Sequence, residues 1–157
     1  SGMGRLFDGV AAILGIKRSC SYEGQGAVLL EAAASADDGV YNYTLDGAPL
    51  RFDWRDMIRG IVTDMNRGDD VGAIAARFMN PLIDRAPRQC GAARSETGLD
   101  SVVLSGGTFQ NMYLMRRLPE RLREAGFTVY HHSRVSTNDE GISLGQLMVA
   151  QHQLERK

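Results

Sequence analysis

The sequence predicts an α/β domain in which several packed helices accompany one parallel strand–helix–strand unit. Apolar residues recur at helical spacing through the first two thirds of the chain, and the last third places a buried-type strand, a helix and a second strand in succession. The length of 157 residues suits one domain, and the 43% hydrophobic and 24% charged content is ordinary for a globular protein. We therefore expect a single domain, residues 1–157.

Charge and composition exclude several classes of protein. The 18 basic and 19 acidic side chains give a net charge of −1, which argues against a nucleic-acid-binding domain with its basic surface. No apolar run approaches the roughly 20 residues that a membrane helix needs. Cys20 and Cys90 form no C-x-x-C motif, so a zinc knuckle is excluded and each is expected to be a buried thiol. The sequence thus predicts a soluble, cytoplasmic domain with no nucleic acid or membrane as a partner.

The first third of the chain is predicted to form two helices and a hairpin. Helical spacing over residues 5–15 predicts a helix that ends at Gly15, and an alanine- and leucine-rich run predicts another over residues 26–36. Residues 41–45 alternate like a strand, and the Asp46-Gly47 turn predicts a return strand over residues 49–52.

Two further helices are expected next. Asp53 is a suitable N-cap for a helix with the clearest apolar stripe in the sequence: Trp54, Met57, Ile58, Ile61, Val62 and Met65. Asp70 is expected to cap another helix that runs to about Ala86. The polar, glycine-containing residues 87–98 then predict an exposed loop.

The final third carries the βαβ unit. Strands are expected over residues 101–104 and 127–130, with a helix over about residues 110–125 between them and a last helix after the polar loop 136–141. Ligands of such units gather at the carboxyl ends of the strands. The loops that follow the two strands are therefore candidate site loops on one edge.

Both loops contain residues suited to chemistry. Ser105, Gly106 and Gly107 follow the first strand, where glycines let a phosphate approach the backbone and a helix start offers free N–H groups. A Gly-Gly turn before a helix has a purely structural role about as often as it binds a ligand. Asp139 in the second loop is either a hard oxygen ligand for a metal or a helix cap. His131 and His132 are interpreted as surface or packing residues, since adjacent strand residues point to opposite faces.

Four segments resemble, in the same order, the last part of the hydrogenase-maturation carbamoyltransferase family HypF. They are residues 4–15 (GRLFD and AAILG), 22–25 (YEGQ), 103–111 (VLSGGTFQN) and 138–146 (NDEGISLGQ). The resemblance spans about residues 4–150. It implies the second lobe of a two-lobed transfer domain, similar to tRNA threonylcarbamoyltransferases, with the actin/sugar-kinase/Hsp70 fold.

The resemblance also implies a function within a larger multidomain enzyme. ATP and carbamoyl phosphate give carbamoyl adenylate, and the transfer domain passes the carbamoyl group to the C-terminal cysteine of the partner HypE. The resemblance assigns nucleotide-binding roles by position to Asp8, Gly24, Ser105, Gly106, Gly107 and Asn111. It makes Asp139 a ligand of a divalent metal (iron, zinc or magnesium), whose remaining ligands lie in the first lobe. We expect no catalytic nucleophile in this chain, and no activity from it alone.

Two departures and two alternatives remain. Ser136 and Thr137 stand where the family usually has prolines, which should loosen a loop, and Met79 stands where a histidine is common. One alternative is an ATP-binding lobe of another actin-like kinase. The other is a non-catalytic docking module that uses Asp46-Gly47 and the loop 87–98 as its surface.

Overall fold

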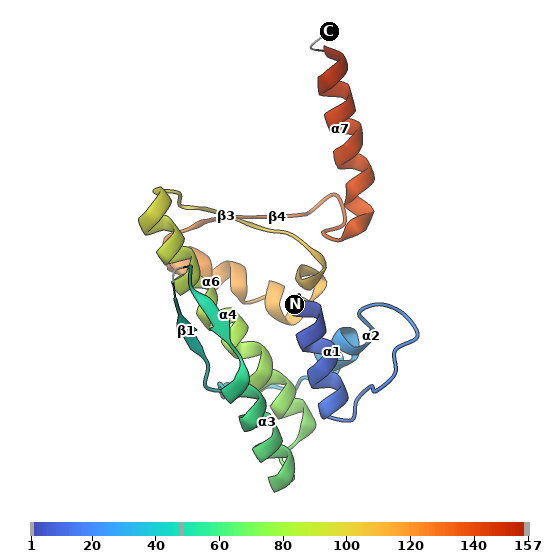
Figure 1. Ribbon diagram of the computed structural model, residues 1–157, viewed down its shortest axis with the longest axis vertical. Helices are drawn as coiled ribbons and strands as arrows, with labels where there is room; N and C mark the ends of the chain where they lie inside the picture. The colour runs from blue at the N-terminus through green and yellow to red at the C-terminus, as the bar shows by residue number, and fades with distance from the viewer. Residues whose placement is uncertain (1, 48, 156–157) are drawn as a thin grey trace.

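The computed structural model describes residues 2–47 and 49–155, which form a helical body, a hairpin and a small α/β unit (Figure 1). The body consists of α1 (Met3–Ile13), α2 (Gln25–Ala33), α3 (Arg55–Arg67) and the long α4 (Val71–Thr97). The expected helices over residues 5–15 and 26–36 are confirmed as α1 and α2. Gly15, with φ of 72°, follows the end of α1, as its position predicts.

Helix α4 is the centre of the core. It contacts α2, α3, α5 and α6. Its Phe78 is fully buried and meets Phe7 of α1 edge-on, with ring centroids 5.0 Å apart. From the α3 stripe, Met57 and Ile61 are fully buried, whereas Trp54 and Val62 remain 41% and 43% exposed. The predicted stripe therefore packs along its centre and not along its margins.

The loop predicted over residues 87–98 is wrong, because α4 continues to Thr97 and ends at Gly98 in the left-handed conformation. Proline is normally a helix breaker, and both Pro81 and Pro87 lie inside this helix. Tertiary contacts outweigh that preference: the Arg94 guanidinium lies 4.2 Å from the ring centre of Phe127 and donates to the carbonyl of Ala125. The docking-module alternative thereby loses one of the two segments that it would use and keeps the turn at Asp46-Gly47.

The hairpin is confirmed with small shifts in its limits. Strands β1 (Thr44–Asp46) and β2 (Arg51–Asp53) pair antiparallel, with Leu45 opposite Phe52. Asp53 was expected to be the N-cap of α3, but Trp54 occupies that position. The Asp53 carboxylate instead accepts from the Arg55 N–H at 3.0 Å and pairs with the Arg55 guanidinium. Asp70, by contrast, caps α4 as expected and accepts from the Ala73 N–H at 2.9 Å.

The last third contains the expected parallel pair. Strand β3 (Ser101–Leu104) pairs with β4 (Thr128–His131) in the register Leu104 opposite His131. The expected continuous helix over residues 110–125 is wrong. Three short helices replace it: η1 (Gly107–Gln110), α5 (Met112–Met115) and α6 (Leu118–Glu124).

The side chains of Asn111 and Glu31 explain the first break, and Pro119 explains the second. Asn111 accepts from the Leu114 N–H at 2.9 Å, and Glu31 of α2 accepts from the Met112 N–H at 2.7 Å, so both cap a new helix at α5. Pro119 lacks an N–H and lies in the first turn of α6, where proline is tolerated.

The chain ends with η2 (Asp139–Gly141) and α7 (Ile142–Glu155). Helix α7 extends away from the body, on the far side of the β3–β4 pair from the other helices (Figure 1). None of the residues of α7 is buried. Among the described residues, no helix combines the length and the apolar character that crossing a membrane requires.

Candidate functional site

The two predicted loops meet at the carboxyl edge of the β3–β4 pair. The Gly106 N–H donates to the Thr137 carbonyl at 2.9 Å, and the Thr137 hydroxyl donates to the Gly106 carbonyl at 3.2 Å. The expectation that both loops share one edge is therefore confirmed. Thr137 holds its loop with a hydroxyl that a proline lacks, so its contacts argue against the expected loosening.

A second link joins the same loops. The Ser105 hydroxyl lies 2.9 Å from Nε2 of His132. His132 follows β4 directly, as Ser105 follows β3, and the register that sets Leu104 opposite His131 brings the next two residues together. The interpretation of His132 as a surface or packing residue missed this contact. Its position immediately after a strand of the parallel pair was the available signal.

A hollow of about 270 Å³ lies between the loops. Its apolar lining includes Leu104 and Phe109, and its polar lining includes Gln110, His132 and Ser136. No carboxylate belongs to the described residues that line it. A hollow lined by amide, hydroxyl and imidazole groups favours a neutral or anionic polar ligand over a cation.

Gly106 and Gly107 differ in what they offer a ligand. Gly106 has φ of 103°, which favours glycine, but its N–H is already bonded to Thr137 and is not free for a phosphate. The free N–H groups that were expected at this turn therefore do not include that of Gly106. A Cβ at Gly107 would meet nothing within 4 Å. The space above Gly107 is therefore open in the described part of the chain.

Asn111 is placed in the core and not at the open edge. Its side chain is 8% exposed, accepts from the Leu114 N–H and donates to the sulfur of Met79 at 3.7 Å. Met79 itself is fully buried. Both functions of the Asn111 amide are therefore engaged in capping α5 and in packing against α4.

Asp8 and Gly24 form a second group on α1 and α2. Gly24 has φ of 77° and is the N-cap of α2. Asp8 is half-buried, and its Oδ1 is buried without a hydrogen-bond partner among the described residues. The absence of a side chain at Gly26 makes room for this oxygen, since a Cβ there would lie 2.7 Å from it. Because α1 also contacts η1, the helix that carries Asp8 borders the glycine turn.

Asp139 is exposed in the first turn of η2. The capping role belongs to its neighbour Asn138, whose side chain accepts from the Glu140 N–H at 3.1 Å. This leaves the Asp139 carboxylate free of the structural role that was its alternative. Within residues 2–47 and 49–155, no group of three or more His, Cys, Asp or Glu side chains is arranged to hold a metal ion. The described residues therefore do not form a metal site by themselves.

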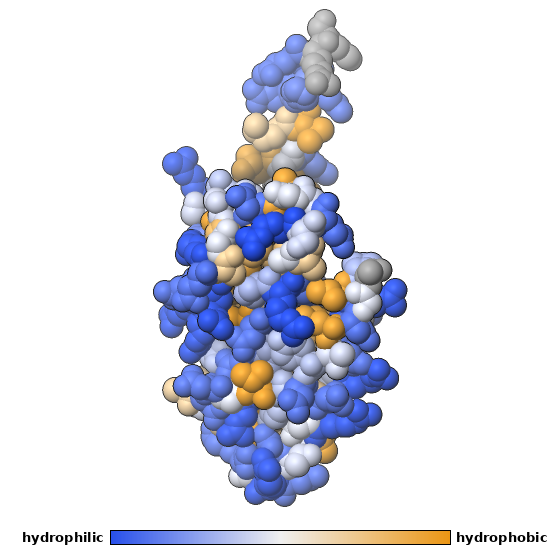
Figure 2. Space-filling view, turned by 90° about the vertical axis from the view of Figure 1, so that its left-hand side faces the viewer, coloured by the Kyte–Doolittle hydropathy of each residue, from blue (hydrophilic) through white to orange (hydrophobic). Residues whose placement is uncertain are grey.

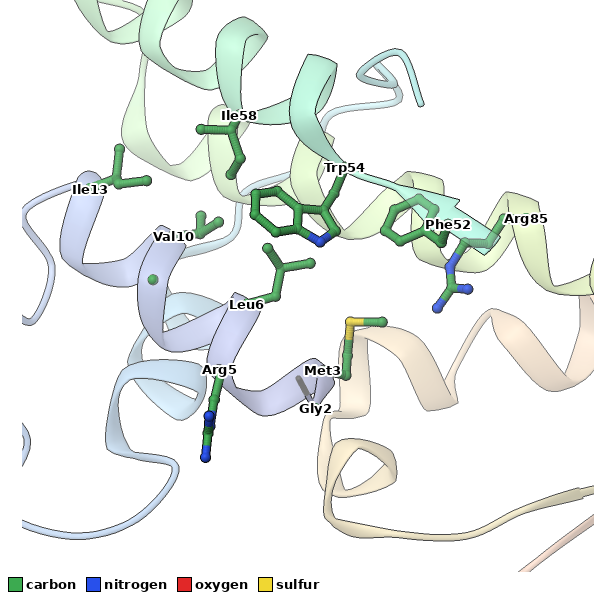
Figure 3. Close-up of a pocket in the computed structure, with 11 residues that line it drawn as sticks. Gly2, Met3, Arg5, Leu6, Val10, Ile13, Phe52, Trp54, Ile58 and Arg85 are labelled. Atoms are coloured by element: carbon green, nitrogen blue, oxygen red, sulfur yellow. The ribbon is translucent and has the colours of Figure 1, made fainter. Parts of the chain in front are cut away.

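A larger hollow, of about 450 Å³, lies elsewhere, between α1, β2, α3 and α4. Figure 3 shows the side chains of Leu6, Trp54 and Phe52 around it. Arg85 lies at one end with its guanidinium 4.4 Å from the ring centre of Phe52, and burial lowers its pKa. None of the predicted site residues lines this hollow.

The cysteines lie outside both hollows. Cys20 is exposed, which contradicts the expected buried thiol, because the loop before α2 leaves it uncovered. Cys90 is half-buried in α4, and burial raises its pKa. Neither cysteine lines a hollow or contacts a predicted site residue through the hydrogen bonds of the described chain.

Comparisons with known proteins place these features in a family. The family model described as "Carbamoyltransferase, Kae1-like Domain, second subdomain" matches residues 1–146. Carbamoyltransferase HypF of Rhodobacter capsulatus is 36% identical over 99% of the chain, and that of a Synechocystis strain is 34% identical over 94%. The chain covers 20% and 19% of these two proteins, so it spans about a fifth of their length.

Two further comparisons concern structure and a related activity. A crystal structure of full-length HypF in a phosphate- and nucleotide-bound form superposes on 99% of the chain with a TM-score of 0.90, at 41% identity and covering 21% of that protein. A tRNA N6-adenosine threonylcarbamoyltransferase of Syntrophotalea carbinolica is 29% identical over 90% of the chain, which covers 43% of its length.

Proposed function

The chain belongs to the HypF carbamoyltransferase family, and on that premise we propose that residues 1–157 are the second, actin-like lobe of a carbamoyl-transfer domain in a larger enzyme. The reaction is transfer of the carbamoyl group of carbamoyl adenylate to the C-terminal cysteine of HypE. The cysteine thiolate attacks the carbamoyl carbon, a C–S bond forms, the C–O bond to the phosphate breaks, and AMP leaves.

The observation that carries this proposal is the joining of the two loops at one strand edge. Ser105 bonds to His132 and Gly106 bonds to Thr137, so the glycine turn and the Asp139 loop act as one unit. Carboxyl edges of parallel strands are the usual ligand sites of α/β folds. We assign the nucleotide to this edge and to the neighbouring Asp8 and Gly24 of α1 and α2.

The described residues take part by binding and orientation. Open space above Gly107 admits a phosphate. Oδ1 of Asp8, which has no hydrogen-bond partner within residues 2–47 and 49–155, is an acceptor for a ligand hydroxyl once the side chain turns from Gly26. A divalent cation, when bound, would neutralise phosphate charge. Asp139 is the one ligand for it that we assign here, and the others would come from the first lobe. Asn111 acts indirectly, by shaping the turn.

Helix α7 supports the assignment to a two-lobed domain. Its first nine residues carry apolar side chains on all sides, and those of Leu147, Met148 and Val149 are 67%, 60% and 59% exposed. Figure 2 shows apolar, orange atoms on the part of the projecting helix next to the body. A helix that is apolar all round is normally buried. The superposition on full-length HypF covers 99% of the chain, which supports an extended α7 in the larger polypeptide as well. We infer that α7 packs against the first lobe.

The test uses the full multidomain enzyme with ATP, carbamoyl phosphate and a HypE-like peptide ending in cysteine. Mass spectrometry follows carbamoylation of the thiol. Asp139→Asn should abolish most of the transfer, whereas the change Glu140→Gln at the adjacent position, which is also exposed, should not. Full activity of Asp139→Asn, or transfer to an acceptor other than the cysteine, would overturn the proposal. The family membership speaks against the kinase alternative. Phosphorylation of a sugar by the full enzyme would favour that alternative instead.

A further inference from the structure

The contact between Ser105 and His132 is built by the sheet itself. Strands β3 and β4 run parallel with Leu104 opposite His131, so the residues that follow leave the sheet side by side. The Ser105 hydroxyl and Nε2 of His132 then lie 2.9 Å apart. Ser105 directly precedes Gly106, and its hydroxyl is therefore held at the start of the glycine turn.

The chemistry of this pair suits an anionic ligand. A serine hydroxyl has one proton and two lone pairs. When Nε2 of His132 carries its proton, the imidazole donates to the serine oxygen, and the hydroxyl proton is left to bond an acceptor outside the pair. Among the described residues, no carboxylate lines the adjoining hollow, where the Gln110 amide supplies a further donor. A phosphate oxygen is the acceptor that such a set of donors favours.

His131 provides a contrast from the neighbouring position. It lies on the same strand end and beside the same hollow, yet its Nδ1 lies 3.2 Å from the main-chain carbonyl of His132 and not near Ser105. If any imidazole beside the hollow could strengthen ligand binding, both histidines would contribute to it. An effect through the serine hydroxyl involves His132 alone.

We propose that His132 is a positioning residue that orients the Ser105 hydroxyl toward a phosphate of the bound nucleotide. This inference rests on the proposed nucleotide site and adds to it a specific hydrogen-bond relay. It predicts that His132 matters for ligands that carry a phosphate and not for the nucleoside part, because Asp8 and Gly24 lie on other elements.

The test is an NMR titration of the 157-residue chain with ATP and, separately, with adenosine, since NMR detects even weak binding. His132→Ala should weaken ATP binding about tenfold, the usual effect of losing one hydrogen bond to a charged group, and leave adenosine binding unchanged. His132→Gln, which keeps a side-chain donor, should recover most of the loss. His152→Ala, an exposed histidine on α7, is the matched control.

A double-mutant cycle separates positioning from simple structural support. Ser105→Ala should weaken ATP binding as much as His132→Ala, and the double variant should lose no more than either. Additive losses, equal losses in His131→Ala, or a loss of adenosine binding in His132→Ala would overturn the inference while leaving the nucleotide site intact. If the unmodified chain binds neither ATP nor adenosine, the same titration is made with the full multidomain enzyme, and absence of binding there as well would show that the proposed nucleotide site is wrong.

Discussion

Replacing Arg77 by methionine should unfold the chain more easily than any exposed charge substitution. The Arg77 guanidinium bonds Asp37 at 3.0 Å, Asp64 at 3.0 Å and Asp69 at 2.9 Å, which joins the segment before β1 to α3 and α4. The Asp64 side chain is only 9% exposed, and it also accepts from the Tyr41 hydroxyl at 2.7 Å. Methionine keeps much of the stem of the side chain and removes the charge.

The expected magnitude follows from burial. Removing one partner from a buried ion pair costs about 3–5 kcal/mol. Asp64 keeps Arg67 as a second partner and the other two carboxylates are partly exposed, so we expect about 2–4 kcal/mol for Arg77→Met. For a chain of this length each kcal/mol lowers Tm by roughly 2–4 °C, so Arg77→Met should lower Tm by roughly 4–16 °C. The matched control is Arg59→Met, because the Arg59–Asp56 pair has side chains that are 75% and 55% exposed. That change should cost about 0–1 kcal/mol.

Thermal unfolding followed by circular dichroism provides the measurement. Equal Tm values for Arg77→Met and Arg59→Met would refute the reasoning, because the network would then contribute no more than an exposed pair.

The Tyr41→Phe variant tests the same network by removing the hydroxyl that donates to Asp64. Burial and then the bond to Asp64 raise the Tyr41 pKa, so its hydroxyl is a donor at neutral pH. Its loss should cost about 1–3 kcal/mol, since Asp64 would lose one partner and keep its charge.

The remaining predictions concern acid and the site. Hydrogen bonds from Arg77 hold the pKa of Asp37 below its ordinary value. The contribution of Asp37 to stability is therefore complete above the unfolded-state pKa of about 3.9 and is lost as pH falls through the folded-state pKa. Urea unfolding at pH 2–7 should show a steep fall in the free energy of unfolding at acid pH, and Arg77→Met should make that fall shallower. The 157-residue chain should fold alone yet transfer no carbamoyl group to a cysteine peptide, and detectable transfer in a mass spectrometric assay would contradict the two-lobed proposal. Gly107→Val should leave Tm nearly unchanged, because its Cβ meets nothing within 4 Å, but should weaken nucleotide binding in calorimetry of the full enzyme; unchanged affinity would remove Gly107 from the phosphate site. Amide exchange in α7 should be fast in this chain and slow in the full enzyme, whereas equal rates would show that the first lobe does not cover α7.

Local patterns predicted most elements, and tertiary contacts decided the rest. The helices at residues 5–15 and 26–36, the hairpin turn at Asp46-Gly47 and the parallel strands follow from periodicity and turn chemistry, which act over a few residues. The end of α4 cannot be predicted in this way, because Pro87 and the polar residues after it are typical of a loop. The helix continues there because Arg94 packs on Phe127, which is more than 30 positions away in the sequence. The break at Asn111 likewise depends on Glu31 of α2, which no local pattern around residue 111 reveals.

In the site, too, some features follow from local sequence patterns and others depend on the register of the strands. Placing the glycine turn and the Asp139 loop on one edge needs only the rule that parallel strands end together. Deciding which residue of the second loop contacts Ser105 needs the register, because a shift by one residue would put His131 or Ser133 in place of His132. Val102 lies opposite Val129, and Leu104 at the end of β3 and Phe127 just before β4 are both buried, which favours this register. The core therefore selects the histidine that meets the serine, so a substitution such as Phe127→Ala, remote from the site, should disturb the Ser105–His132 contact as well as stability.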